Sequence, residues 1–407
     1  MERRESNIGG VRPAGAFVLV PLAFAACVGA RSGAPPAIVA EIAPVAVPPN
    51  DVARLPRGAC ASEVAETAPY AAPADARTLT TPSADRTVTL PLGAEGAWSG
   101  RHGGAAEPLH AVWGSGSEIY AAGTSRLLHS RDRGKTFADS RAPITASFVW
   151  GTSPDDVYLG GGRSLAHSAD GGATWSVSEP FPEDAHVVAL AAEEADLYVV
   201  GGRSSGVPVL MHSSDRGRTW TEPATGIERG WFYGVAVRSS SATTHLHDVF
   251  VSGHDRGGEG PLLLRSSDCG ATWSSLLTPS RATEGDKPGP LCVTQSGRVV
   301  LAMAYAVFTS DDSGTSWTKS VEVGTEILAL TCRGEEIFAG GRNRAFVHSR
   351  DGGATWNDRE LAGQWTAPAL SSIEGVFVIE NGDAYAVGEG LYTSPSGSIF
   401  RRAGRTR

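Results

Sequence analysis

The sequence predicts an all-β protein: a seven-bladed β-propeller of four-stranded blades, preceded by a signal segment and a disordered tether. Three observations predict this fold class. The 407 residues include 50 glycines and 25 prolines, which break helices and suit tight turns. One eight-residue motif recurs along the chain. The spacing of its copies is close to the length of one propeller blade.

The repeated motif reads Ser-x-Asp-x-Gly-x-Thr/Ser-Trp/Phe, and its first copy spans residues 130–137. Its aspartates are Asp132, Asp170, Asp215, Asp268, Asp312 and Asp351. They are 38 to 53 residues apart, and one four-stranded blade takes about 40 to 45 residues. Short alternating stretches with glycine-marked ends precede the copies and predict three strands per blade. With a decayed seventh copy at residues 393–400, we expect seven blades over residues 107–404.

The residue types of the motif suit a structural turn. The aspartate can accept backbone N–H bonds, and the glycine allows the positive φ of a tight turn. The final tryptophan begins the outer strand and is expected to pack between neighbouring blades. We therefore predict that the six aspartates are structural rather than catalytic.

The strand that closes the ring is open to two interpretations. Residues 86–92 alternate between apolar and polar side chains and could complete the last blade. The short terminal strand at residues 398–400 could complete it instead.

The N-terminus is predicted to be a targeting segment. An apolar run at residues 14–26 follows three arginines and ends at Cys27; it is too short to span a bilayer. It resembles a bacterial lipoprotein signal, with ordinary cleavage after Ala25 or Ala26 as the alternative. The expected organisation is a signal peptide (1–26), lipidation of Cys27, an Ala/Pro-rich tether (27–85) and the propeller (86–407). This chain would be exported, either as an outer-membrane or periplasm-facing lipoprotein or as a secreted protein.

Export makes disulfides possible. With Cys27 assigned to lipid, Cys60, Cys269, Cys292 and Cys332 remain, and four cysteines allow three pairings. Cys292 and Cys332 fall on first strands of adjacent blades and could pair, but isolated thiols are the alternative. No cysteine pair has zinc-ligand spacing, so we predict neither a metal nor a cofactor.

The net charge of −9 argues against nucleic acid as a partner. Arginine nevertheless recurs in the turns between second and third strands, which share one face of a propeller. These residues are Arg126, Arg163, Arg203, Arg342 and Arg344. They predict a basic patch that binds an anionic protein partner. The alternative is that they are solvated or form ion pairs.

The motif copies quoted above are identified as Asp-box repeats, also called BNR repeats. Over residues 107–404 the chain resembles the seven-bladed propellers of the photosystem II stability/assembly factor family and their bacterial relatives. That resemblance implies an exported, sometimes lipid-anchored, non-catalytic scaffold that binds proteins through an arginine patch. Membrane contact is then expected only through the N-terminal lipid.

A more distant similarity to sialidase-type propellers keeps two alternatives open, a glycoside hydrolase and a glycan-binding module. The arginine-containing motif of sialidases is not found in any blade. Carboxylates that a hydrolase could use occur on the loops between blades. They are Glu183, Asp184, Glu222, Glu284 and Asp286.

Overall fold

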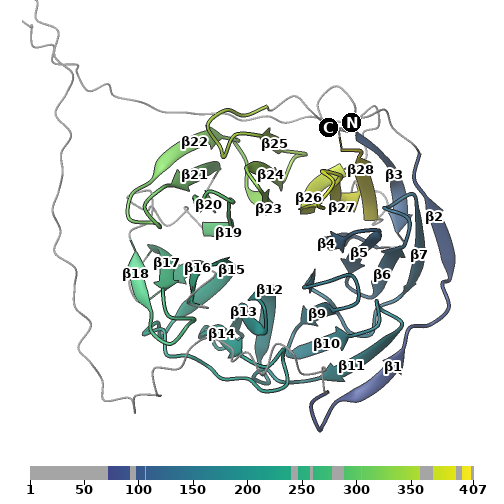
Figure 1. The fold of residues 1–407 in the computed structure, drawn as a ribbon, viewed down its shortest axis with the longest axis horizontal. Helices are drawn as coiled ribbons and strands as arrows, with labels where there is room; N and C mark the ends of the chain where they lie inside the picture. The colour runs from purple at the N-terminus through teal and green to yellow at the C-terminus, as the bar shows by residue number, and fades with distance from the viewer. Residues whose placement is uncertain are drawn as a thin grey trace, which may run out of the picture. The chain divides into compact units, whose positions relative to one another are not determined.

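The computed structural model describes residues 72–91, 98–105, 107–239, 246–256, 260–276, 288–303, 305–357, 370–390 and 397–404. These residues form seven antiparallel sheets arranged as blades around one axis, as the sequence predicts (Figure 1). The strands of each blade follow chain order from the axis outward, apart from three outer strands that come from residues 77–105 (Figure 1). The part of the chain that the structure describes contains no helix.

The strands of blades 1 to 3 follow one another along the chain. Blade 1 is β4 (Leu109–Ser115), β5 (Glu118–Gly123), β6 (Arg126–Ser130) and β7 (Thr136–Arg141). Blade 2 is β8 (Phe148–Gly151), β9 (Val157–Gly161), β10 (Ser164–Ser168) and β11 (Thr174–Ser178). Blade 3 is β12 (Ala185–Glu193), β13 (Asp196–Arg203) and β14 (Pro208–Ser213), and a single bridge to Thr221 stands in the place of its fourth strand.

Blades 4 to 6 continue in the same order. Blade 4 is β15 (Gly230–Ser239), β16 (His247–Asp255), β17 (Gly260–Ser266) and β18 (Ser274–Leu276). Blade 5 is β19 (Pro288–Val293), β20 (Val299–Met303), β21 (Ala306–Ser310) and β22 (Thr318–Glu322). Blade 6 is β23 (Ile327–Arg333), β24 (Glu336–Gly341) and β25 (Phe346–Ser349), with a single bridge to Asn357 outside β25.

Blade 7 closes the ring with strands from both ends of the described chain. It is β26 (Leu370–Val378), β27 (Ala384–Gly390), β28 (Gly397–Arg402) and, as its outermost strand, β3 (Trp98–Ala105). Neither segment considered for closure therefore supplies the fourth strand. Residues 86–89 form β2 (Arg86–Thr89), a fifth strand outside β7 of blade 1. The terminal strand β28 is the third strand of blade 7 rather than the fourth.

A further outer strand, β1 (Arg77–Thr80), pairs with β11 of blade 2. These residues are predicted to belong to the tether, whereas in the structure they lie on the edge of a blade. Strands β1, β2 and β3 thus cover the outer edges of blades 2, 1 and 7 in turn (Figure 1). Covering an outer edge satisfies backbone groups that would otherwise be free to pair with another chain.

The second strands are buried on both sides because neighbouring blades enclose them. All residues of β9 and β20 are buried, for example. Each hydrophobic cluster accordingly spans two blades: Trp113 and Tyr120 of blade 1 pack with Leu159 and Trp175 of blade 2. The glycines at second-strand ends are needed because the first strand comes very close. A Cβ on Gly341 would lie 2.1 Å from the carbonyl oxygen of Glu326.

Each of the six motif copies forms the turn from the third to the fourth strand of its blade. In blade 2, Asp170 Oδ1 accepts bonds from Ser168 Oγ at 2.8 Å and Thr174 N at 2.8 Å, and Oδ2 accepts one from Thr174 Oγ1 at 2.6 Å. Gly172 has φ of 79°, and its N–H donates to Ser168 Oγ at 2.7 Å. The proposed roles of the aspartate and the glycine are confirmed. We call these turns the repeat turns.

The prediction of a decayed seventh motif copy is wrong for the residues that the structure describes. Residues 397–400 lie inside β28, where Tyr385 pairs with Arg401 just as Tyr120 pairs with His129 in blade 1. By this register Arg402 takes the place of the first serine of a repeat turn. Asp383 caps the end of blade 7 instead, accepting bonds from Gly404 N at 2.6 Å and Arg401 Nη2 at 3.0 Å.

The repeat turns predict a loss of stability in acid. Burial alone would raise the pKa of most of these carboxyls, but hydrogen bonds from the turn lower it in all six. The bonds from Thr355 hold the pKa of Asp351 at about 2. Because an unfolded aspartate has a pKa of about 3.9, the unfolded state binds protons first as the pH falls.

We therefore expect the Tm to fall progressively as the pH is lowered from about 4 to about 2. Circular dichroism melts at half-unit steps between pH 6 and pH 2 measure this change. A Tm that stays constant between pH 5 and pH 2 would contradict the assigned hydrogen bonds.

Candidate functional site

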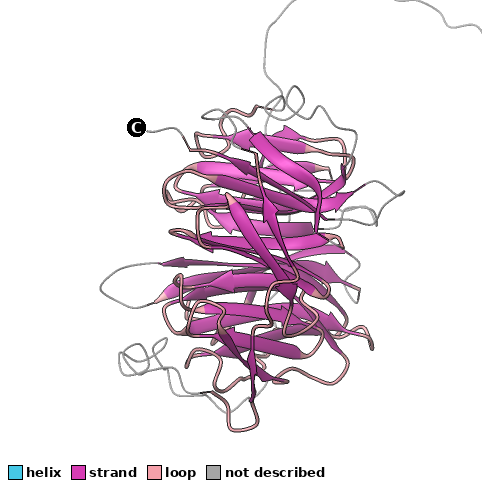
Figure 2. Ribbon diagram, turned by 90° about the vertical axis from the view of Figure 1, so that its right-hand side faces the viewer, coloured by secondary structure: helices cyan, strands magenta, loops and turns pink. Residues whose placement is uncertain are grey.

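The strands of the propeller end in loops on two opposite faces (Figure 2), and the strand order places different turns on each face. One face, the repeat-turn face, carries the repeat turns together with the turns between first and second strands. In blade 1 these two turns touch through Arg133 N and Ser117 O at 3.0 Å. The other face, the loop face, carries the turns between second and third strands and the loops between blades. There Ala142 N of the blade 1–2 loop bonds to Ser125 O of the β5–β6 turn at 2.8 Å.

Polar groups of the repeat-turn face are used to join one blade to the next. The hydroxyl of Tyr198 on β13 donates to the carbonyl of Cys269 in the repeat turn of blade 4 at 2.9 Å. Tyr385 makes the same bond from blade 7 to Arg133 of blade 1 at 3.0 Å. Burial raises the pKa of both phenols far above the usual range, so both hydroxyls remain donors.

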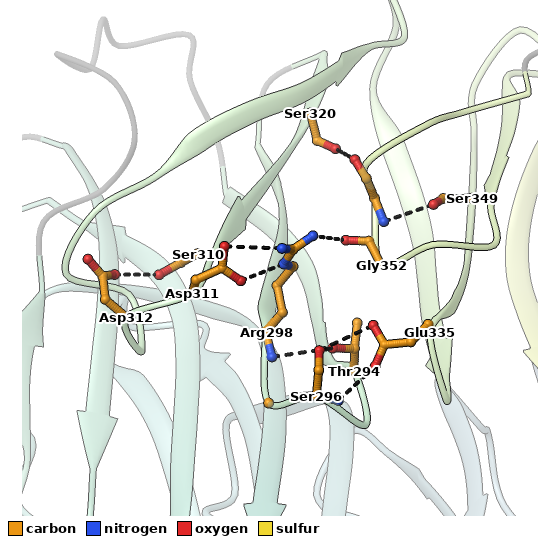
Figure 3. A network of polar contacts seen from close by, with 12 residues as sticks. Thr294, Ser296, Arg298, Ser310, Asp311, Asp312, Ser320, Glu335, Ser349 and Gly352 are labelled. Carbon is orange, nitrogen blue, oxygen red and sulfur yellow. Dashed lines mark hydrogen bonds and ion pairs between the residues drawn. The ribbon is translucent and has the colours of Figure 1, made fainter.

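In blade 5, where Val300 stands at the position of these tyrosines, an arginine two residues earlier makes a comparable contact. Arg298 of blade 5 donates to Gly352 O of the blade 6 repeat turn at 2.7 Å and pairs with Asp311 at 2.6 Å (Figure 3). Glu335 of blade 6 accepts a bond from Ser296 N of blade 5 at 2.7 Å (Figure 3). The contacts of this face therefore hold the ring together.

The loop face carries the arginines that the sequence singles out. Arg126 is a structural residue: its Nε donates to Asp139 Oδ1 at 2.8 Å, and it also pairs with Asp85. Asp139 is fully buried and also binds Arg86 of β2 at 2.6 Å. Arg126 therefore ties the fifth strand to blade 1 and has little surface of its own.

The other predicted arginines are more exposed, and three of them are paired within their own blade. Arg163 pairs with Glu179 at 2.5 Å, and Arg203 makes two bonds to Glu222 at 2.7 and 2.8 Å. Both carboxylates follow the outer strand position. Arg342 instead pairs with Glu326, just before the inner strand β23, at 2.5 Å.

These contacts agree with the ion-pairing alternative for Arg126, Arg163, Arg203 and Arg342. Arg344 is exposed with φ of 62°, and no ion pair of it is found among the described residues. Tyr305, in the β20–β21 turn of the same face, has 56% of its surface exposed. It is the most exposed large hydrophobic residue in the described ranges.

A polar pair joins two first strands at the loop face, and sequence reasoning missed it. His110 on β4 contacts Glu374 on β26 through Nδ1, so the pair bridges blades 1 and 7. That hydrogen bond, opposed by burial, raises the pKa of His110 above its usual value. Burial alone would raise the pKa of Glu374, but bonds from His110 and Ser372 lower it. The only signal in the sequence is a lone histidine at the start of a first strand.

Four other histidines occupy a repeated structural position. Each lies on a third strand and pairs with a carboxylate at the start of the second strand: His129 with Glu118, His167 with Asp156, His212 with Asp196 and His348 with Glu336. Each also stacks on an aromatic ring of the second strand. These histidines belong to the blade core and are not candidates for a site.

Two of the carboxylates considered for a hydrolase have hydrogen-bond partners on the same face. Glu222 is held by Arg203, and Asp184 accepts a bond from Ser205 N at 3.4 Å. The hydrogen bonds of Ser205 lower the pKa of Asp184. Glu284 and Asp286 lie outside the described residues.

A pocket of 1290 Å³ opens on the repeat-turn face among the first-to-second-strand turns of blades 5, 6 and 7. Its wall has paired charges: Arg333 binds Glu380 at 3.1 Å, and the buried Arg402 lies 3.7 Å from Glu336. Cys332 also lines it and forms a disulfide with Cys292, with Cα atoms 5.6 Å apart. The pairing of Cys292 with Cys332 is thus one of the alternatives that the sequence left open.

The remaining cysteines lie partly outside these residues. Cys269 is disulfide-bonded, whereas Cys27 and Cys60 are not among the described positions. Within the described ranges, no three His, Cys, Asp or Glu side chains are grouped as a metal ion requires. Those ranges also hold no helix long and apolar enough to cross a membrane.

Comparison with known proteins supports the fold. No family model matches the chain, and no curated protein matches it either. Among solved structures, YCF48 bound to D1 peptide superposes with a TM-score of 0.56 at 16% identity, covering 78% of this chain and all of that one. YCF48 from Cyanidioschyzon merolae gives 0.53 at 15% identity, covering 75% and 98%.

A third similar structure is the extracellular domain of a one-component system from B. thetaiotaomicron, with a TM-score of 0.52 at 12% identity. The superposition covers 77% of this chain and 40% of that one. At these identities the likeness shows a seven-bladed propeller.

Proposed function

We propose that this protein is an exported, lipid-anchored scaffold that binds a protein partner through its loop face. The observation that carries the proposal is the difference between the two faces. Polar groups of the repeat-turn face join blades to one another, as Tyr198, Tyr385 and Arg298 do. The loop face presents Arg342, with 61% of its side chain exposed, and Tyr305, the most exposed large hydrophobic residue in the described ranges.

The comparisons support a protein partner, because one similar propeller is bound to a peptide. Identification of the repeat turns as Asp-box repeats, export and lipidation of Cys27 rest on the sequence. Under this proposal no metal or cofactor is needed, and the lipid at Cys27 makes the membrane contact.

The paired arginines suit a partner with both charges. Arg163 and Arg342 each keep much of their surface exposed while paired with a carboxylate. An exposed ion pair is worth about 0–1 kcal/mol, so an acidic group of the partner could exchange with Glu179 or Glu326 at little cost. Acidic segments of the partner would then contact the guanidinium groups.

Replacing Arg163, Arg203 and Arg342 together by glutamate should abolish capture of the partner without unfolding the propeller. The expected loss exceeds about 100-fold in Kd, because charge reversal in an interface places like charges together. The measurement is a pull-down from detergent-solubilised envelopes at low and high salt, followed by binding titration of the captured protein.

A matched control reverses three exposed basic residues of the repeat-turn face, Arg131, Lys135 and Arg218. This control changes the net charge equally and should bind as the wild type does. Equal capture by both triple variants would overturn the proposal. A lower Tm for the loop-face variant alone would be detected by melting both variants.

A further inference from the structure

Three side chains on the loop face form a chain of contacts from a hydroxyl to a carboxylate. Thr124, in the β5–β6 turn, has its Oγ1 3.4 Å from Nε2 of His110. The Nδ1 of the same imidazole contacts Glu374 Oε2. Ser372 Oγ donates to the other carboxylate oxygen at 2.8 Å. A hydroxyl, an imidazole and a carboxylate thus follow one another in order.

The carboxylate decides which nitrogen of His110 carries the proton. An ionised carboxylate only accepts hydrogen bonds, so Nδ1 is the donor toward Glu374. In the neutral imidazole Nε2 is then the free base, and it faces the hydroxyl of Thr124. This is the arrangement by which a base, oriented by a third group, makes a hydroxyl nucleophilic.

The site is open to small molecules. The imidazole of His110 has 34% of its side chain exposed, and Thr124 is exposed. The distance of 3.4 Å between Thr124 Oγ1 and His110 Nε2 is longer than a strong hydrogen bond. Such catalytic contacts are often long without substrate and tighten when the substrate binds. Carboxylates surround the imidazole: Glu374 contacts it, and Glu107 and Glu389 act on it through charge. They favour neutral or cationic substrates over anionic ones.

Blade 3 carries a similar pair of a histidine and a hydroxyl, but no carboxylate is found beside that histidine in the described residues. His186, at the start of β12, lies with Nε2 2.9 Å from Ser204 Oγ in the β13–β14 turn. No ion pair of His186 is found in the part of the chain that the structure describes, and Trp231 stacks on its ring with centroids 6.3 Å apart. What distinguishes blade 1 is that blade 7 supplies Glu374 across the closing seam.

We propose that Thr124, His110 and Glu374 form a nucleophilic acyl-transfer site for small neutral or cationic esters. Thr124 Oγ1 attacks the ester carbonyl carbon while its proton passes to His110 Nε2. The bond to the leaving oxygen breaks, and the leaving alcohol takes the proton from His110. Water, activated in the same way, then hydrolyses the acyl-threonine and returns the hydroxyl to Thr124.

Glu107 accepts hydrogen bonds from the backbone N–H groups next to the hydroxyl of Thr124. Its Oε1 accepts bonds from the backbone N–H groups of Ser125 and Arg126, the latter at 2.8 Å. Two adjacent N–H groups next to a nucleophile could stabilise the oxyanion of the tetrahedral intermediate. Glu107 must therefore turn aside for the reaction, and Glu107→Ala should accelerate acylation.

The test is hydrolysis of p-nitrophenyl acetate by the full chain, with mass spectrometry of Thr124 after quenching. We expect Thr124→Val and His110→Gln each to lower kcat/KM at least about 100-fold, whereas Thr124→Ser keeps activity. His186→Gln is the matched control and should leave the rate unchanged. Equal rates for wild type and Thr124→Val, or no turnover above that of free imidazole, would overturn the proposal.

Glu374 is a positioning residue, so its test is the pH profile. The rate should rise with pH as His110 loses its proton, with a midpoint above the usual pKa of the imidazole. Glu374→Gln should move that midpoint to lower pH, because the carboxylate no longer stabilises the imidazolium; Glu107, Glu389 and, near Glu374, Arg342 remain. A lower rate with an unmoved midpoint would show a merely structural role and contradict the assignment of Glu374.

Discussion

Replacing Asp139 by alanine is expected to lower the free energy of unfolding by about 3 kcal/mol. Its carboxylate is fully buried and binds Arg86 Nε at 2.6 Å and Arg126 Nε at 2.8 Å. Removing it leaves the guanidinium of Arg126, which has only 13% of its surface exposed, without its main partner. Strand β2 should also detach from the edge of β7, because Arg86 loses its contact with blade 1.

Urea denaturation of the Asp139→Ala variant measures the loss of stability. Hydrogen exchange of the residues of β7 measures whether their edge becomes exposed. Arg126→Ala should have a smaller effect of the same sign, since the buried carboxylate loses one of its two arginines and keeps Arg86. A loss below about 1 kcal/mol for both variants would show that this pair behaves as an exposed one.

Replacing Asp312 by alanine is expected to lower the free energy of unfolding by about 2 kcal/mol. Replacing its neighbour Asp311 by alanine should lower it by less than about 1 kcal/mol. Asp312 accepts bonds from Ser310 Oγ at 2.8 Å, Ser316 N at 2.8 Å and Ser316 Oγ at 2.6 Å. Asp311 is largely exposed, and its side-chain bonds within the described residues go to Arg298. The two variants remove the same group one residue apart.

Urea denaturation of both variants in one buffer gives the comparison. The cost at Asp312 arises because Ser316 N–H and two hydroxyls lose their acceptor inside a turn that needs positive φ at Ser313 and Gly314. Equal losses for the two aspartates would contradict a structural role for the motif aspartate.

The fold could be predicted because the signal is local and repeated. Each repeat turn is specified by residues within eight positions, and the same local contacts form in every copy. The seventh copy failed for the same reason. Residues 397–400 have motif-like letters but lack the aspartate, and their pairing with β27 makes them a strand.

Closure of the ring could not be predicted from alternation. Residues 86–89 alternate between apolar and polar side chains, but any strand with one buried side does so. The alternation therefore does not distinguish pairing with blade 7 from the observed pairing with β7 of blade 1. The strand that closes the ring, β3, contains three glycines and no alternation. Its place depends on pairing with β28, about 300 residues away in the sequence.

The partners of the candidate site residues could not be predicted from the sequence. The loop positions of the five arginines could be inferred from the blade pattern, but not their partners. Arg163 and Arg203 are paired with carboxylates 16 and 19 residues further along, at positions that vary between blades. The contact of His110 with Glu374 joins residues 264 apart and exists only because the ring closes.

The central claim, that a partner binds the loop face, is tested most directly by site-specific photocrosslinking. A photoreactive amino acid replaces Arg344 on the loop face or, as the control, the exposed Arg218 on the repeat-turn face, and envelopes supply the partner. The account predicts a discrete protein adduct from position 344 and none from position 218. Adducts from position 218 alone, or the same adducts from both positions, would contradict binding through the loop face.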